Sequence, residues 1–228
     1  MIRSGRDVSR LEGFSDAVFG FALTLLVVSL EVPDNFDGLK AILRGFIPFA
    51  ATFALVCWIW FEHYSFFRRF DAEDGLTIVL NCALLFLVLF FVYPLKFVFS
   101  HVIPSMMGQG RGLPGTEADG RLLMWVYGAG FAAVMMVFVL LYWNQYRRRK
   151  ELKLSPEQIF EARMGARYHM VSVSVALVSI VVALAIPIKL IGIAGAVYML
   201  QGPLHWRNGV LTERQRARAF PSSTPAPR

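Results

Sequence analysis

Four polar side chains stand at or inside long apolar runs of this sequence, where charges and hydrogen-bonding groups are costly. Asp16 opens one apolar run, Glu62 and His63 end another, and Asn81 lies early in a third. Ionisable residues in such places are functional candidates, because hydrocarbon does not solvate them. We interpret Asp16, His63 and Asn81 as a hydrogen-bonded cluster between helices. Glu62 is interpreted as an interfacial carboxylate that reaches water.

Ser15 has a different interpretation from its polar neighbour. Serine is favoured at the N-cap of a helix, and the carboxylate of Asp16 beside it suits the positive end of the helix dipole. We therefore predict that Ser15 caps the first helix.

The sequence offers no pattern for metal binding or nucleophilic catalysis. The four histidines, at positions 63, 101, 169 and 205, lie far apart. Cys57 and Cys82 lie in apolar stretches without metal-ligand spacing, so we expect reduced thiols, no disulfide and no cofactor. An intramembrane enzyme is accordingly the least supported class, and we predict that the protein is not an enzyme.

The composition is that of a membrane protein. Hydrophobic residues make up 56% of the chain and charged residues 17%, and the mean hydropathy is +0.53. A soluble chain of 228 residues with so few charges would expose large apolar patches. The net charge of +7 therefore predicts basic loops that face anionic lipid, and not a nucleic-acid partner.

Six runs approach the roughly 20 apolar residues that a helix needs to cross a bilayer. They are Phe14–Leu30, Ala41–Phe61, Leu76–Phe99, Leu122–Trp143, Met170–Ile188 and Leu190–Leu204. The first run is short, so neighbouring helices must shield it from lipid. Pro187, Ile188 and Lys189 separate the last two runs as a tight hairpin, and Pro94 is expected to kink the third.

The distribution of lysine and arginine gives the orientation of these runs. With the N-terminus inside, the inner segments hold 17 of the 23 basic residues. The outer segments hold the other six: Lys40, Arg44, Lys96, Arg111, Arg121 and Lys189. Because cytoplasmic loops retain positive charge, we predict a multi-pass protein of the cell membrane with both termini in the cytoplasm.

Three polar segments complete the organisation. Ser100–Gly120 is rich in glycine and proline and predicts an irregular outer loop. Ser155–Gln158 reads S-P-E-Q, a capping box with proline at the first helical position, so a cytoplasmic helix begins there and continues into span five. From Arg207 the composition shifts to Arg, Ser, Thr and Pro, which predicts a disordered tail. The expected domains are thus a six-helix transmembrane domain, 1–206, and a cytoplasmic tail, 207–228.

The first three spans resemble a known family. Arg10–Asp16 reads R-L-E-G-F-S-D, which matches the R-x-x-x-F-S-D motif of potassium channels related to the lysosomal channel called transmembrane protein 175. Ala17–Leu26 resembles the family's first helix, and Trp60–His63 is a W-x-x-H at the end of span two. Asn81 and Pro94 fall where the family has an Asn and a Pro on span three. The second half resembles the family mainly by hydropathy.

The resemblance implies a homotetramer of six-span subunits whose first helices line a central pore. It implies a channel without the T-V-G-Y-G filter, which this sequence also lacks. The motif residues would form a network with spans two and three, away from the pore: Arg10, Phe14, Ser15, Asp16, Trp60, His63 and Asn81. In the family an apolar residue five positions after the motif Asp forms the constriction, with a Thr three positions further. These positions are Phe21 and Thr24, and Phe21 departs from the usual aliphatic side chain.

Helical spacing places these pore candidates together. Ala17, Phe21, Thr24 and Val28 recur at steps of four, three and four and so share one face, with Leu25 beside it. Most apolar stripes pack against lipid or a neighbouring helix. The Thr in this stripe, the short helix and the resemblance favour a pore wall with Phe21, Leu25 and Val28 at the constriction and Thr24 at the selectivity position.

The leading functional hypothesis is a potassium-favouring, weakly selective cation channel. An apolar constriction gates by dewetting, and partial dehydration favours K⁺, which holds its water less tightly than Na⁺. The expected partners are further copies of the chain, the lipid bilayer, and K⁺ and other monovalent cations. The alternative is a proton- or ion-coupled transporter in which Asp16 and His63 form a relay. A transporter predicts mid-bilayer polar groups and paired broken helices, and the sequence gives neither clearly.

Overall fold

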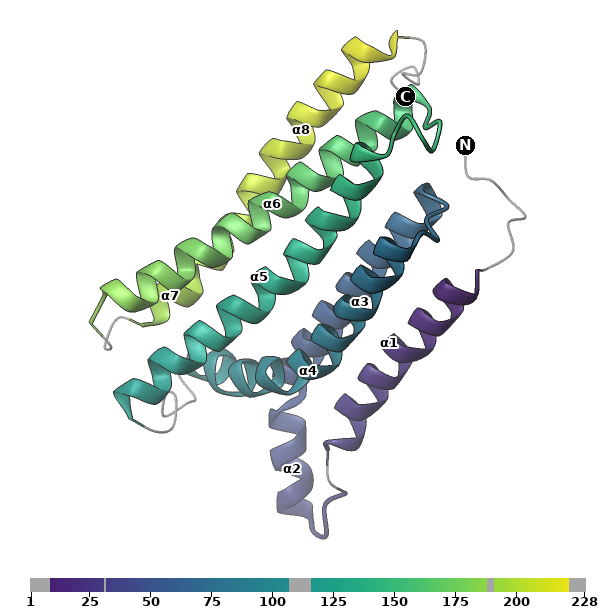
Figure 1. The fold of residues 1–228 in the computed structure, drawn as a ribbon. Coiled ribbons are helices and arrows are strands. Elements are labelled where there is room, and N and C mark those ends of the chain that lie inside the picture. The colour runs from purple at the N-terminus through teal and green to yellow at the C-terminus, as the bar shows by residue number, and fades with distance from the viewer. Residues whose placement is uncertain (1–8, 31, 107–115, 188–190, 222–228) are drawn as a thin grey trace, which may run out of the picture. The chain divides into compact units, whose positions relative to one another are not determined.

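The computed structural model describes residues 9–30, 32–106, 116–187 and 191–221, and the regular structure in these ranges is helical (Figure 1). Residues 1–130 form one compact unit and residues 131–228 a second. The first unit holds α1 (Arg10–Val28), α2 (Phe36–Arg44), α3 (Phe46–Arg69), α4 (Gly75–Met106) and the start of α5 (Glu117–Arg147). The second holds the rest of α5, α6 (Pro156–Ala185), α7 (Gly192–Ala196), the 3₁₀ turn η2 (Val197–Leu200) and α8 (Gln201–Ala219).

Five helices in the described ranges are long and apolar enough to cross a membrane: α1, α3, α4, α5 and α6. They correspond to the first five predicted spans. The observed helices are longer than the apolar runs, because the helices continue into the polar residues that flank these runs. The second run ends at Phe61, for example, whereas α3 continues to Arg69. Glu62 therefore lies within α3, half-buried, and not at its end.

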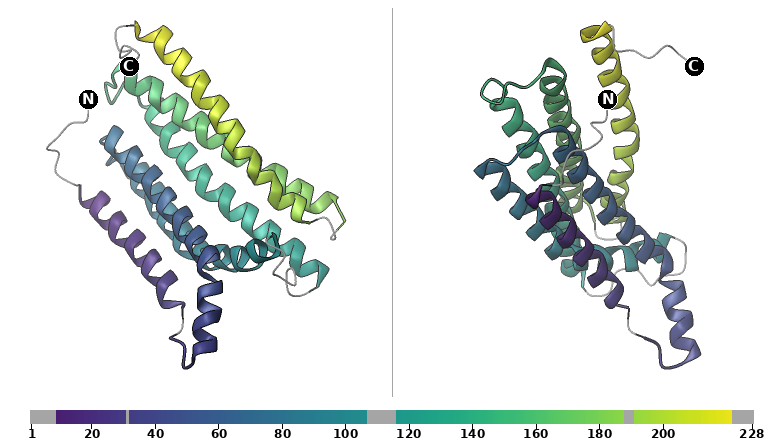
Figure 2. Two further views of the ribbon diagram at one scale, coloured as in Figure 1. Left: turned by 180° about the vertical axis from the view of Figure 1, so that it is seen from behind. Right: turned by 90° about the vertical axis from the view of Figure 1, so that its right-hand side faces the viewer.

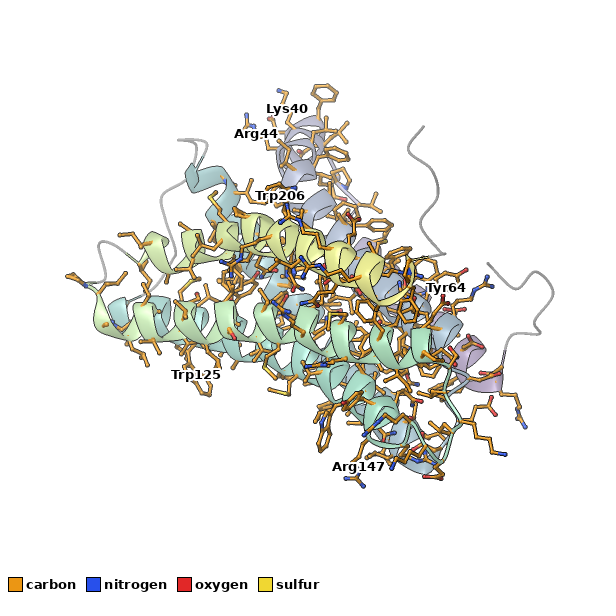
Figure 3. All side chains as sticks on the ribbon, turned by 90° about the horizontal axis from the view of Figure 1, so that it is seen from above. Lys40, Arg44, Tyr64, Trp125, Arg147 and Trp206 are labelled. Carbon is orange, nitrogen blue, oxygen red and sulfur yellow. The ribbon has the colours of Figure 1, made fainter. Side chains whose placement is uncertain are left out.

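The segment between α1 and α3 differs from the prediction. A separate short helix, α2, precedes α3, which begins at Phe46 after the N-cap Gly45. Lys40 and Arg44 point outward on α2 (Figure 3), and Phe36, Leu39 and Leu43 are exposed as well. The second span thus starts later than Ala41.

The predicted outer loop, Ser100–Gly120, is shorter than expected. α4 remains helical to Met106 and α5 is helical from Glu117, while residues 107–115 lie outside the described ranges. α4 also bends along its length (Figures 1 and 2), and Pro94 lies inside it. Pro104 lies inside α4 as well. A proline removes one backbone hydrogen bond and its ring displaces the preceding turn, so a bent helix is expected here.

The start of α6 agrees with the prediction. Ser155 Oγ accepts the N–H of Gln158 at 3.2 Å, and Gln158 Oε1 accepts the N–H of Ser155 at 3.0 Å. Pro156 occupies the first helical position. The capping box and the single helix that runs from it into span five are therefore confirmed.

The last part of the chain is a broken helical run antiparallel to α6. Ser179 of α6 donates to the carbonyl of Ala194 at 2.7 Å, and Ser172 Oγ lies 2.9 Å from His205 Nε2. Residues later in this run bond to residues earlier in α6, as expected for two antiparallel segments. The predicted span Leu190–Leu204 contains α7, η2 and the first residues of α8, and residues 188–190 lie outside the described ranges.

The predicted disordered tail is wrong for residues 207–219, which continue α8. Asn208 is buried, and Thr212 Oγ1 contacts Met164 Sδ at 3.7 Å. The segment from Arg207 onward consists of two parts with different compositions, which the prediction treated as one. The first part is rich in helix-forming Arg, Gln, Glu, Leu and Ala, and the Pro and Ser residues begin at Pro221. Residues 222–228 lie outside the described ranges.

Candidate functional site on the first helix

A capping box fixes the start of α1. Ser9 Oγ accepts the N–H of Glu12 at 3.2 Å, and Glu12 Oε2 accepts the N–H of Ser9 at 2.9 Å. The helix therefore begins at Arg10, and the prediction that Ser15 is its N-cap is wrong. The S-x-x-E pattern at 9–12 was available in the sequence and would have located this start.

One face of α1 packs against α3 and α4. Its buried residues are Ser15, Phe19, Ala22 and Leu26, which recur at steps of four, three and four. This spacing is that of one face of an α-helix, so the packing fixes the rotation of α1 about its axis. Residues on the opposite face must then point away from α3 and α4.

A chain of hydrogen bonds joins α1, α3 and α4 in this packed region. Asn81 Nδ2 of α4 donates to Ser15 Oγ of α1 at 2.9 Å, and Asn81 Oδ1 lies 2.8 Å from His63 Nε2 of α3. Ser15 Oγ in turn donates to the carbonyl of Leu11 at 2.8 Å. All three linked side chains are buried. The structure thus brings Ser15, His63 and Asn81 together, including the serine that was predicted to cap.

The hydrogen-bond chemistry assigns the protonation of His63. An amide oxygen only accepts, so His63 Nε2 must carry the hydrogen that bonds to Asn81 Oδ1. His63 Nδ1 is buried and has no hydrogen-bond partner among the described residues. The rings of Phe19 and Phe67 lie 5.5 and 4.6 Å from the imidazole, centroid to centroid. The cluster therefore combines a buried hydrogen-bond chain with aromatic packing between helices.

Asp16 lies outside this chain. Its Oδ1 accepts the indole N–H of Trp60 at 2.8 Å in an exposed contact between α1 and α3. It forms no hydrogen bond with His63 in the described structure, so the predicted grouping of Asp16 with His63 and Asn81 is wrong at the level of direct contacts. The physical reason is the helical rotation: consecutive residues 15 and 16 point in different directions, and only Ser15 lies on the buried face. Arg10 and Phe14 are also exposed.

The predicted pore residues lie on the exposed side of α1. Phe21 is 68% exposed and Val28 70%, and Ala17 and Thr24 are exposed as well. Leu25, at the edge of this stripe, is half-buried. Thr24 Oγ1 donates its hydrogen to the carbonyl of Gly20 at 2.9 Å, which leaves the oxygen lone pairs free to accept. One protomer therefore leaves an apolar stripe with one hydroxyl oxygen uncovered.

The sequence analysis missed a second polar contact on α1. Lys96, which was counted only as an outer-side charge, lies on α4, and its ammonium group donates to both the backbone oxygen and the hydroxyl of Ser29. The distances are 3.1 and 2.6 Å. A lysine within a strongly apolar run was the available signal.

Together the fold and this site define an α-helical integral membrane protein in which polar contacts hold the first helix against the third and fourth. A model of the family described as "Endosomal/lysosomal potassium channel TMEM175" matches residues 10–91. A "Potassium channel" of Marivirga tractuosa is 35% identical over 226 residues, which cover 94% of this chain and 91% of the relative. A "Potassium channel" of Chamaesiphon minutus is 26% identical over 140 residues, 58% of this chain and 63% of the relative.

Solved structures give the same result. The crystal structure of a variant of the potassium channel MtTMEM175, in complex with a nanobody fusion protein, matches with a TM-score of 0.80 at 35% identity. The match covers 94% of this chain and 97% of that one. A TMEM175 homologue from Chamaesiphon minutus shares the fold, with a TM-score of 0.53 at 24% identity over 87% of this chain and 96% of that one. The chain belongs to the TMEM175 family, as a prokaryotic member.

Proposed function

We propose that this protein is a potassium-favouring, weakly selective cation channel, a homotetramer in which four copies of α1 line a central pore. The observation that carries the proposal is the uncovered stripe on α1. α3 and α4 cover the opposite face, so the stripe faces either lipid or other copies of the chain. A polar Thr24 within it suits an aqueous pore better than lipid. The relatives named as potassium channels support the pore.

The constriction in this proposal consists of Phe21, Leu25 and Val28. Phe21 lies five residues after Asp16, or about 7.5 Å further along the axis of α1. Four phenyl rings at that depth would repel water and set the narrowest point. Val28 would continue the apolar wall towards the outside.

Selectivity in this proposal comes from Thr24, one turn beyond Phe21. Its hydroxyl hydrogen is bonded to the carbonyl of Gly20, so four hydroxyl oxygens, one from each subunit, would face the axis as acceptors. K⁺ loses water more easily than Na⁺ when it enters an apolar ring, and hydroxyl oxygens would replace part of the lost shell. This mechanism gives a modest preference and needs no carbonyl filter.

The hydrogen-bonded contacts of α1 have a scaffolding role in this proposal. Asn81, Ser15 and His63 hold the pore helix from behind, and Trp60 binds Asp16 nearer its start. Arg10 and Phe14 are exposed in one protomer and would meet neighbouring subunits. The transporter alternative requires proton transfer between Asp16 and His63, and the two side chains bond to different partners.

The topology we propose has six spans and cytoplasmic termini, in the cell membrane. α7, η2 and α8 follow one another without a gap from Gly192 to Ala219. This run returns along α6: its later residue Arg216 lies 4.0 Å from Glu161, near the start of α6. A chain end that returns along span five places both termini on one side, as the lysine and arginine distribution predicts.

Reconstituted protein tests the proposal. Purified full-length protein in planar bilayers should give ohmic currents without any coupling gradient, with a reversal potential that favours K⁺ under bi-ionic K⁺ and Na⁺. Its mass in detergent or nanodiscs should be that of four chains. Flux that depends on a proton gradient would support the transporter alternative, and the absence of any ion flux would refute the channel.

A further inference from the structure

We propose that Lys96 is a positioning residue that holds the outer end of the pore helix α1. The inference deepens the proposed function, because it assigns the element that keeps the α1 helices in place beyond the constriction. Among the five apolar helices, Lys96 is the single lysine in their sequences. It is half-buried on α4 and bonds to α1 across 67 residues of sequence.

The contact completes the C-terminus of α1. Ser29 is the C-cap, and its hydroxyl donates to the carbonyl of Leu26 at 2.6 Å while its N–H donates to the carbonyl of Leu25 at 3.0 Å. Lys96 then donates to the hydroxyl and carbonyl oxygens of Ser29. One serine thus links the last turn of α1 to an ammonium group on another helix.

The charge of Lys96 suits this place. The C-terminus of a helix carries partial negative charge, and a cation there is stabilising. α1 has no basic residue in its own last turn. No carboxylate in the described ranges pairs with Lys96, so its ammonium is directed to Ser29. The neighbouring helix therefore supplies the cation that α1 lacks.

Two polar contacts now join α1 and α4 at matching intervals. Ser15 binds Asn81 and Ser29 binds Lys96. The intervals are 14 residues on α1 and 15 on α4, about 21 and 22 Å at the helical rise. Phe21, Leu25 and Val28 all lie between the two contacts. The stretch of α1 that would form the constriction is thus fastened at both ends to one helix.

Loss of the outer contact should let the end of α1 move. In membranes, polar contacts between helices contribute on the order of 0.6–1.7 kcal/mol, so the detached population should rise about threefold to twentyfold. The pore wall at Val28 would then vary in position. We expect Lys96→Met to broaden the distribution of unitary K⁺ current amplitudes while the tetramer stays intact.

Hydrogen exchange measures the position of α1 independently of conduction. In nanodiscs, peptides that cover residues 23–30 should exchange about threefold to twentyfold faster in Lys96→Met, because exchange follows the open population. Lys96→Arg keeps the donors and should restore slow exchange and the wild-type amplitude distribution. Ser29→Ala removes one of the two acceptors and should give a smaller increase in the exchange rate. In the double mutant of Ser29→Ala and Lys96→Met, the increase should be less than the sum of the two single effects.

Lys40→Met is the matched control. It removes the same charge from the same predicted side of the membrane, but Lys40 binds Asp37 on α2, at 3.0 Å, and not α1. The proposal fails if Lys96→Met leaves both exchange and current amplitudes unchanged, or if Lys40→Met reproduces its effects. If Lys96→Met does not assemble, Ser29→Ala decides by the same two measurements. A wild-type protein without ion flux would remove the proposed channel, whereas the exchange of α1 would still test the contact.

Discussion

Asn81 on α4 binds Ser15 on α1 and His63 on α3 with opposite ends of one amide group. The nitrogen donates to Ser15 Oγ at 2.9 Å, and the oxygen accepts from His63 Nε2 at 2.8 Å. An amide is suited to this place because it carries both a donor and an acceptor without charge. A carboxylate at position 81 would offer no donor to Ser15. An aliphatic residue would leave His63 Nε2 without its acceptor and Ser15 Oγ with only its bond to the carbonyl of Leu11.

This relationship predicts the order of stability losses in the cluster. Asn81→Ala removes partners from two buried groups and should destabilise the protein by about 1–3 kcal/mol, near the low end in a membrane. Ser15→Ala removes one and should cost less. Their double mutant should be less destabilised than the sum, with a coupling of about 0.6–1.7 kcal/mol. Thermal unfolding in detergent measures all three, and additive losses would contradict the shared contact.

Asp16→Ala is the comparison from outside the cluster. Because Asp16 binds Trp60 in an exposed position, its loss should cost less stability than His63→Ala, which empties a buried site between phenyl rings. We expect neither substitution to change the ratio of K⁺ to Na⁺ permeability in assembled protein. A normal tetramer with altered ion preference in Asp16→Ala would place Asp16 in the path of the ions.

The extent of α8 predicts the effect of truncation. Deletion of residues 222–228 should leave the unfolding midpoint unchanged. Deletion of 207–228 removes the buried Asn208 and the contacts of Thr212 and Arg216 with α6, and should lower the midpoint by roughly 4 °C or more, at 2–4 °C per kcal/mol. Equal midpoints for both truncations would mean that residues 207–219 do not pack on α6.

Much of the fold was predictable because its signal is local. Apolar runs gave five spanning helices, and the Ser155–Gln158 pattern gave the start of α6. The polar cluster was predictable only in part. Sequence positions placed Asp16, His63 and Asn81 near one end of their helices, but the rotation of α1 decides whether residue 15 or 16 meets Asn81, and this rotation depends on packing against α3 and α4. Lys96 was missed because a charge count treats it as part of a loop.

A glycine in the second unit predicts a steric effect. A Cβ at Gly165 of α6 would overlap the Tyr142 ring of α5, whereas a Cβ at Gly202 of α8 would meet nothing within 4 Å. Tyr142 is buried and stacks on His169, so it cannot move away freely. Gly165→Ala should destabilise by roughly 1–3 kcal/mol. Gly202→Ala should be neutral or slightly stabilising, since alanine favours the helix. Equal unfolding midpoints would show that Tyr142 has room to shift.

The proposed topology predicts which sites are accessible. In a background of Cys57→Ser and Cys82→Ser, a cysteine at Gln109 should react with an impermeant reagent from outside only. A cysteine at Ser222 should react only after the membrane is permeabilised. In the proposed topology α4 and α6 both run from the cytoplasmic side to the outside. Residue 109 follows α4 and is therefore outside. Residue 222 follows α8, which runs back along α6, and is therefore inside. Labelling of Ser222 from outside would overturn the orientation.

The pore predicts two different effects from neighbouring turns of α1. Phe21→Ala removes the bulky apolar side chain at the proposed constriction, so water should enter and the leak should rise for both K⁺ and Na⁺. Thr24→Ala leaves the phenyl rings in place but removes the hydroxyl oxygens, so the closed state should persist while the preference for K⁺ falls. Gly20→Ala is a control on the same helix, because its added Cβ meets nothing within 4 Å in the protomer.

Single-channel recordings under bi-ionic K⁺ and Na⁺ separate these outcomes. A shift of the reversal potential in Thr24→Ala with low leak, and high leak without selectivity in Phe21→Ala, would place both residues on the ion path in the proposed order. If the exposed stripe faced lipid instead, both substitutions would alter packing or partitioning and leave permeation alone. Unchanged currents and reversal potentials in both variants would therefore remove α1 from the pore, even though its contacts with Asn81 and Lys96 would still hold it against α4.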